Sequence, residues 1–242
     1  MSQLNIFHNF KSKNFDQRKK KIDFIILHYT ETKTLKKAVE LLTSDKRKVS
    51  CHYLLSKKGK IYNLVNEYKR AWHAGVSSWK NLEDINSRSI GIEIVNPGES
   101  SCGVYPDIQI ISLIKLIKFL MKKFKINSHN ILGHSDIAPL RKTDPGKFFP
   151  WKELNKHNIG LWANSKKINK KLNLKNLNLF LENLKIIGYP ELGPEQKGTK
   201  NFKVIEAFHR HYLPELIEQE PTLASLNKTL MLIKKKNIDK IS

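Results

Sequence analysis

Three side chains of metal-ligating type stand out by their spacing. His134 and Asp144 lie ten residues apart across one loop, and His28 ends the apolar run IDFIILH far upstream. Imidazole and carboxylate groups are common zinc ligands, and a catalytic zinc site uses three protein ligands and keeps a fourth position open. If these three side chains converge in the fold, we expect a metal-dependent hydrolase.

Two further charged residues suit the chemistry of such a site. Glu93 lies in the apolar stretch GIEIV, and Lys142 lies two residues before Asp144. Burial would raise the pKa of Glu93 and make it a useful general base for a zinc-bound water. An ammonium at Lys142 can stabilise an oxyanion. The alternatives are a buried Glu93 paired with Arg88 or a lysine, and a solvated lysine at position 142.

The other histidines separate by their surroundings. His52 and His73 lie in or beside apolar or aromatic segments, where an imidazole needs a partner. Five histidines are expected to be solvated or to serve packing only: His8, His129, His157, His209 and His211.

The hydrophobic pattern predicts a scaffold of alternating strands and helices. Strands are predicted at 22–29, 89–95 and 130–134, a hairpin around Lys58-Gly59, and helices at 35–44, with Thr34 as N-cap, and 108–124. This order indicates an α/β fold with a central mixed β-sheet flanked by α-helices. His28, Glu93 and His134 all fall at or near predicted strand ends, where ligands gather in such sheets.

The composition divides the chain into four parts. Residues 1–21 are polar and basic and are interpreted as a leader or an outer edge, and residues 22–164 as the catalytic domain. Residues 165–176 are rich in Lys and Asn and predict a linker. Residues 177–242 predict a small domain of three helices, at about 177–187, 201–213 and 221–236.

Charge and hydropathy narrow the classes of function. The net charge of +22 is spread along the chain, which predicts attraction to polyanions but supplies no clustered nucleic-acid motif. Nucleic acid is therefore not expected as the primary partner. No apolar run reaches the roughly 20 residues that span a bilayer. The absence of a signal peptide favours the cytoplasm, with a periplasmic or secreted location as the alternative.

The motifs together resemble a known family. They are HYT (28–30), SCHYLL (50–55), AWHAG (71–75), SIGIEI (89–94) and GHSDIAPLRKTDPGKFFPW (133–151). This set is similar to the zinc-dependent N-acetylmuramoyl-L-alanine amidases of the type 2 amidase family, whose fold peptidoglycan recognition proteins and phage T7-type lysozymes share. The resemblance covers about residues 22 to 162 and extends to bacterial amidases that accept 1,6-anhydromuropeptides.

The resemblance implies roles for individual residues. One zinc ion per chain would be held by His28, His134 and Asp144, with Glu93 as catalytic glutamate and Lys142 as transition-state lysine. Cobalt or manganese could also be accepted by two imidazoles and a carboxylate.

The resemblance also implies a substrate groove. Trp72 and His73 would line it, and Asn86 and Arg88 would lie on the loop before the catalytic strand. For all four residues a purely structural role is the alternative.

The activity implied is hydrolysis of the amide between N-acetylmuramic acid, including its 1,6-anhydro form, and L-alanine of the stem peptide. The expected partners are peptidoglycan fragments or the sacculus, and the expected state is a monomer. The C-terminal helices resemble a small peptidoglycan-binding module, with a generic helical cap as the alternative. A non-catalytic peptidoglycan recognition protein of the same fold is the rival function, although that class tends to lose a zinc ligand.

Overall fold

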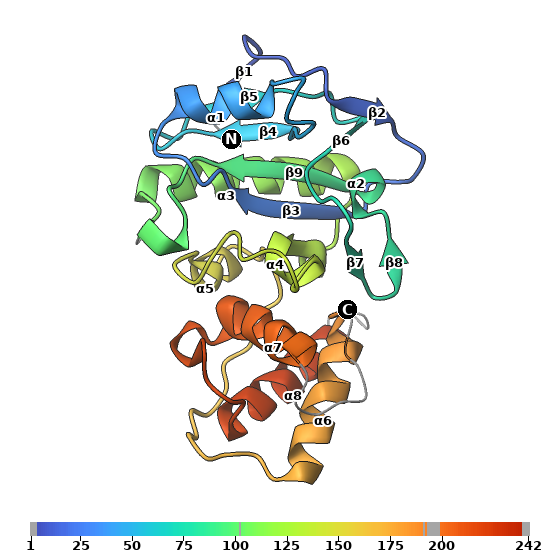
Figure 1. Cartoon of the computed structure of the whole chain (residues 1–242), viewed down its shortest axis with the longest axis vertical. Coiled ribbons are helices and arrows are strands. Elements are labelled where there is room, and N and C mark those ends of the chain that lie inside the picture. The colour runs from blue at the N-terminus through green and yellow to red at the C-terminus, as the bar shows by residue number, and fades with distance from the viewer. Residues whose placement is uncertain (1–3, 102, 191, 193–198, 239–242) are drawn as a thin grey trace.

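A six-stranded sheet forms the centre of the computed structural model, which describes residues 4–101, 103–190, 192 and 199–238 (Figure 1). Its strand order is β1-β5-β4-β9-β3-β10, and the described neighbours run parallel except for β4 and β5. The strands are β1 (Ile6–Phe7), β3 (Phe24–Tyr29), β4 (Tyr53–Leu55), β5 (Ile61–Asn63), β9 (Ser89–Ile94) and β10 (Ile131–Gly133). The mixed sheet with flanking helices confirms the predicted fold class.

Side-chain alternation along the two central strands decides which residues can form a site. On β3, Ile25 and Leu27 point into the same apolar cluster as Leu113 and Ile117 of the long helix α3 (Asp107–Phe124). Successive strand residues point to opposite faces, so His28 lies on the face away from α3. Glu93 is the register partner of His28 on β9 and shares that face.

Helices cover the sheet where the hydrophobic pattern predicts them. The helix α1 (Leu35–Leu42) begins at Thr34, whose hydroxyl accepts a hydrogen bond from the Lys37 backbone N–H at 3.2 Å. The helix buries Ala38 and Leu42 in a cluster with Leu54 of β4. Short helices α2 (Ile85–Arg88), α4 (His134–Ile137) and α5 (Trp151–Asn155) lie in the connections around the site.

The N-terminal residues form the outer edge of the domain. Strand β1 pairs with β5, and β2 (Phe15–Gln17) pairs with β6 (Lys69–Ala71). The Arg18 guanidinium donates hydrogen bonds of 2.7 to 3.3 Å to the carbonyl oxygens of Glu67, Lys69, Asn86, Ser87 and Ser89. These contacts tie the segment around Arg18 to the start of β9 and to the chain before β6.

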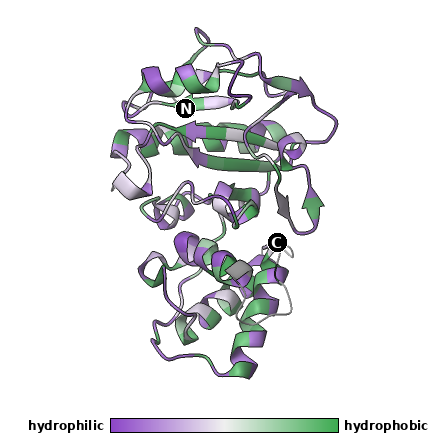
Figure 2. Ribbon diagram, in the orientation of Figure 1, coloured by the Kyte–Doolittle hydropathy of each residue, from purple (hydrophilic) through white to green (hydrophobic). Residues whose placement is uncertain are grey.

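Three C-terminal helices gather at one end of the molecule, with α4 and α5 between them and β3 (Figure 1). They are α6 (Leu174–Ile187), α7 (Thr199–Tyr212) and α8 (Leu223–Ile238), close to the predicted ranges. Residue 165, near which the sequence predicts a domain boundary, lies in the segment between α5 and α6. In Figure 2 helices α6 and α7 carry both hydrophobic and hydrophilic residues, as two-faced packing helices require.

The C-terminal helices share a hydrophobic core with the sheet. Phe180 and Phe208 belong to the same buried cluster as Ile26 of β3 and Leu132 of β10. The C-terminal helices therefore bury apolar surface against one side of the sheet, while two further buried clusters lie wholly within the first part of the chain. None of the described helices is long and apolar enough to cross a membrane. Cys51 is a free, buried cysteine, and Cys102 lies outside the described residues.

Candidate metal centre and active site

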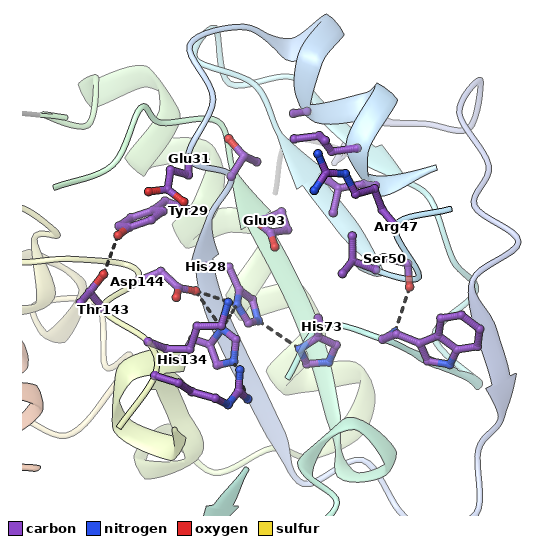
Figure 3. A pocket seen from close by; sticks show the side chains of 18 residues that line it. His28, Tyr29, Glu31, Arg47, Ser50, His73, Glu93, His134, Thr143 and Asp144 are labelled. Atoms are coloured by element: carbon purple, nitrogen blue, oxygen red, sulfur yellow. Dashed lines mark hydrogen bonds and ion pairs between the residues drawn. The ribbon is translucent and has the colours of Figure 1, made fainter. Parts of the chain in front are cut away.

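Three potential ligand atoms meet at the carboxyl ends of β3 and β10. The His28 Nδ1 lies 3.0 Å from the His134 Nδ1 and 2.9 Å from the Asp144 Oδ2, which is 3.0 Å from the His134 Nδ1 (Figure 3). All three residues are buried. Among the described residues this is the group of three His, Cys, Asp or Glu side chains whose geometry could hold a metal ion.

A directional chain of hydrogen bonds fixes the tautomer of His28. The Ser89 hydroxyl donates to the Ile85 carbonyl at 2.6 Å, so its oxygen accepts from the His73 Nε2 at 3.2 Å. The His73 Nδ1 is then an acceptor and receives the His28 Nε2–H at 3.0 Å. The lone pair of His28 is left on Nδ1, which faces the other two ligand atoms.

The imidazole of His134 is oriented by Ala74, the residue that follows His73. The His134 Nε2 lies 3.1 Å from the Ala74 carbonyl, which can only accept, so Nε2 is the donor in this contact and Nδ1 is the nitrogen available to a metal. The Asn86 Oδ1 accepts from the His73 and Ala74 backbone N–H groups at 3.0 and 2.7 Å. The 72–75 loop thus directs both lone pairs to one point. Partners of this kind raise the basicity of metal-bound histidines and fix their rings.

The ligand atoms carry the charges that a cation needs. Burial would raise the pKa of Asp144, but the imidazoles, His134 foremost, hold that pKa well below its usual range. Burial, with His134 nearby, lowers the pKa of His28 to about 4. Near neutral pH the site therefore presents a carboxylate and a neutral His28 imidazole, which are the protonation states that metal binding requires.

Gly91 of the GIEI motif makes room for this arrangement. A Cβ at Gly91 would overlap the His73 ring, and Gly91 lies next to His52, whose Nδ1 accepts the Gly91 N–H at 2.9 Å. We expect Gly91→Ala to displace His73, release His28 from its fixed tautomer and weaken metal binding by about 10- to 100-fold, the usual cost of losing such a partner. Competition with a chromogenic chelator measures this.

A matched control separates displacement of His73 from general loss of packing. Ile92→Val removes one methylene from the adjacent, fully buried position of β9, on the face toward α3. It is expected to lower stability by about 0.5–1.5 kcal/mol and to keep metal affinity unchanged. Equal metal affinity in Gly91→Ala and the parent protein would contradict the orienting function of His73.

Glu93 is a partly buried acid, and one of its carboxylate oxygens has no hydrogen-bond partner among the described residues. Its Oε2 is buried and accepts no hydrogen bond, and its side chain points toward the same cavity as His28 and Asp144 (Figure 3). Burial raises the pKa of Glu93 well above its ordinary value, Asp144 raises it further, and Lys142 opposes the shift. The alternative pairing with Arg88 is absent, because the Arg88 Nε donates to the Glu83 carbonyl at 3.3 Å. Glu93 is thus poised to exchange a proton.

A cavity of about 480 Å³ lies above these residues. Lys142, Trp72 and His73 line it together with the three potential ligands and Glu93. The Trp72 indole N–H donates to the Asp16 carboxylate at 2.7 Å, which fixes the ring at the cavity edge. The sequence-predicted residues from four separate segments are therefore brought to one concave site.

Asn86 and Arg88, which were expected beside the substrate, do not line this cavity. Asn86 is buried and holds the 72–75 loop, and the Arg88 guanidinium contacts the Glu83 carbonyl. These contacts are structural ones. Both residues precede the start of strand β9 at Ser89, whereas Glu93 lies near the other end of that strand.

Sequence reasoning missed several residues that line the cavity. The Arg141 guanidinium donates hydrogen bonds to the Ala74 and Val76 carbonyls and so fixes the C-terminal end of the 72–75 loop. The Tyr29 hydroxyl lies 2.7 Å from that of Thr143. Arg47 adds a cation beyond α1. Tyr29, Arg141 and Thr143 each adjoin a predicted site residue in sequence, which was the available signal, whereas nothing near Arg47 pointed to the site.

The sequence pattern of the family described as N-acetylmuramoyl-L-alanine amidase matches residues 18–147, more than half of the chain. The chain belongs to this family. It is 34% identical over 219 residues to the N-acetylmuramoyl-L-alanine amidase AmiD of Escherichia coli, covering 83% of this chain and 78% of that protein. It is 43% identical over 105 residues to the 1,6-anhydro-N-acetylmuramyl-L-alanine amidase AmpD of Haemophilus influenzae, covering 43% of this chain and 55% of that protein.

Solved structures extend the likeness to the C-terminal helices. AmiD from Escherichia coli, in complex with its substrate anhydro-N-acetylmuramic acid-L-Ala-D-gamma-Glu-L-Lys, aligns with a TM-score of 0.81 at 30% identity, covering 94% of this amidase-family chain and 93% of that chain. AmpDH3 from Pseudomonas aeruginosa aligns with a TM-score of 0.77 at 29% identity, covering 97% and 100%. Because the two alignments cover 94% and 97% of this chain, they include α6–α8.

Proposed function

We propose that this protein is a zinc-dependent N-acetylmuramoyl-L-alanine amidase. It hydrolyses the amide between N-acetylmuramic acid, including the 1,6-anhydro sugar, and L-alanine of the peptidoglycan stem peptide, in wall degradation or recycling. The observation that carries the proposal is that the ligand atoms of His28, His134 and Asp144 lie 2.9–3.0 Å from one another. Glu93, whose buried Oε2 has no hydrogen-bond partner, lies beside them. The named activity and ligands of the relatives support it.

The donor set fits zinc. Two imidazole nitrogens and one carboxylate oxygen, each within 3.0 Å of the others, can all be contacted by one ion at the roughly 2.0–2.2 Å bond lengths of zinc. The cavity beside them leaves a side open for water and substrate, as a catalytic site requires. When bound, zinc would supply a Lewis acid for the scissile carbonyl and a water of lowered pKa.

Glu93 and Lys142 perform the proton and charge chemistry in this proposal. The Glu93 carboxylate takes a proton from the attacking water and passes it to the departing nitrogen of L-alanine, which breaks the C–N bond as an amine leaves. Its raised pKa suits both steps, because a general base that later acts as an acid works best with a pKa near the working pH. Lys142 balances the negative charge that grows on the carbonyl oxygen.

Lys142→Met is expected to lower kcat by about 10²-fold with little change in KM, because the ammonium acts mainly on transition-state charge. Steady-state kinetics on a purified anhydromuropeptide measure both constants. The control is Lys147→Met in the same loop, whose ammonium lies 5.4 Å over the Phe148 ring and whose side chain is not in the cavity lining. A tenfold rise in KM with unchanged kcat in Lys142→Met would assign that lysine to substrate binding instead.

Mass spectrometry of reaction products tests the proposed function. The zinc-loaded protein is incubated with a purified anhydromuropeptide and, side by side, with intact sacculi. Release of a peptide with a free L-alanine amino terminus supports the amidase, and the ratio of the two rates shows whether fragments or polymer are preferred. A zinc-loaded protein that binds the muropeptide without cleaving it would support the rival recognition protein.

We propose that the active unit is a monomer. All residues assigned to the metal site and to proton transfer come from one chain and meet in one cavity. Sedimentation of the active, zinc-loaded protein tests this, and a concentration-dependent specific activity would contradict it.

A further inference from the structure

Asp136, two residues after His134, carries a fully buried carboxylate. Its Oδ2 accepts from the Gly133 backbone N–H at 2.7 Å and from the His211 Nδ1 at 2.8 Å, and its Oδ1 accepts from the Tyr189 hydroxyl at 2.6 Å. A buried carboxylate needs such donors. Two of the three come from the C-terminal part of the chain, so the short helix that begins with His134 depends on that part for its geometry.

The donor at position 211 is held rigidly. The His211 ring stacks on Trp151 with centroids 3.8 Å apart and on Tyr212 with centroids 3.9 Å apart. Trp151 begins α5, directly after the loop that carries Asp144. The imidazole is therefore packed between the rings of Trp151 and Tyr212, with its Nδ1 directed at Asp136.

A second contact comes from the preceding residue of the same helix. The Arg210 Nε lies 2.9 Å from the Glu99 Oε2, and both side chains are at least four-fifths buried. The same Glu99 oxygen accepts from the Lys147 backbone N–H at 3.1 Å. Helix α7 thus reaches the start of the 134–147 segment through His211 and its end through Arg210. That segment carries His134, Lys142 and Asp144.

We propose that the C-terminal helices act as an intramolecular clamp that positions the 134–147 segment for metal binding, with Tyr189, Arg210 and His211 as positioning residues. The HRHY stretch that sequence alone assigned to solvent or packing is the contact face of this clamp. This face of α7 is buried against the catalytic part and is not available to bind cell wall. The clamp rests on the proposed metal site, although its effect on the 134–147 segment is measurable without metal.

The test uses the full-length chain and single-group substitutions. Tyr189→Phe removes only the hydroxyl that donates to Asp136, and His211→Phe keeps an aromatic ring between Trp151 and Tyr212 but removes the donor. Each is expected to release Zn²⁺ to excess chelator about tenfold faster than the parent. In the metal-free proteins, hydrogen exchange of the 134–147 amides is expected to rise while exchange of β3 and β9 amides stays unchanged.

Matched controls lie on α7. Tyr212→Phe removes a hydroxyl with no hydrogen bond among the described residues, and His209→Phe removes a ring whose bond, 2.9 Å to the Ser225 hydroxyl, stays within the C-terminal helices. Both are expected to stay within twofold of the parent in zinc release. If Tyr189→Phe and His211→Phe match the parent in zinc release and exchange, the clamp is wrong while the amidase stands. A parent protein that binds no zinc would overturn the metal site itself.

Discussion

Glu93→Gln is expected to lower kcat by about 10³-fold while one zinc ion per chain stays bound. The substitution keeps the shape of the side chain but removes the group that takes and returns the proton, a contribution that is typically 10²- to 10⁴-fold. The zinc content should not change, because Glu93 lies on β9 beside the three potential ligands but is not one of them. Single-turnover kinetics and metal analysis of the same sample measure the two quantities.

Glu31→Gln is the matched control, since it removes another carboxylate that lines the same cavity. It is expected to change kcat by less than about tenfold, because its carboxylate has no part in the proton transfer that general-base catalysis requires. A Glu93→Gln variant with kcat within tenfold of the parent would exclude Glu93 as the general base and direct attention to water or another carboxylate.

The same substitution is expected to stabilise the metal-free protein at neutral pH. Burial raises the folded-state pKa of Glu93 above its value in the unfolded chain, about 4.3. The folded state therefore binds the extra proton between those two pKa values, and stability from this group is lost as pH rises through that range. Glutamine does not titrate, so Tm of the variant should exceed that of the parent at pH 7 and approach it near pH 4.

Asp144→Asn is expected to abolish stoichiometric zinc binding and to reduce activity by at least about 10³-fold. The amide keeps the size of the carboxylate but removes the only negative charge of the three donors, and a catalytic metal contributes several kcal/mol to the transition state. Zinc per chain after dialysis and kcat/KM at fixed zinc concentration measure the loss.

Asp45→Asn serves as the control for removing one negative charge, since Asp45 is exposed in the turn after α1. It should keep one zinc ion and parental activity. An Asp144→Asn protein that retains both would show that the metal, if present, lies elsewhere. Restored activity at millimolar zinc would instead show a weakened but intact site, as the loss of one of three ligands predicts.

Much of the scaffold could be predicted because its signals are local. The runs that form β3 and β9 are almost continuously apolar, and such runs are typical of central strands that are covered on both faces. Thr34 and the spacing of α1 gave that helix its start and its buried side. The order of these elements was enough to bring the ends of β3, β9 and β10 together, and with them His28, Glu93 and His134.

The parts that could not be predicted depend on side-chain direction and on distant partners. Strand β1 has two residues and β2 has three, so neither is long enough for an alternating pattern to mark it. Their partners are distant in sequence: β1 pairs with β5, and β2 pairs with β6, which Arg18 also contacts. The spacing of AWHAG placed His73 near the site but could not tell a ring that faces substrate from one that accepts a hydrogen bond from His28. The sequence predicted a helix at about 201–213 but gave no sign that its His211 and Arg210 would contact Asp136 and Glu99.

The buried cluster that joins Phe208 and Phe180 to Ile26 and Leu132 has an evolutionary consequence. A wall-binding appendage on a flexible tether can be gained, lost or exchanged by recombination without harm to the enzyme that carries it. Here such an exchange would expose Phe180 and Phe208 on the C-terminal helices and Ile26 and Leu132 on the sheet to solvent. The two halves of this gene are therefore expected to be inherited together and to change in concert along their shared boundary.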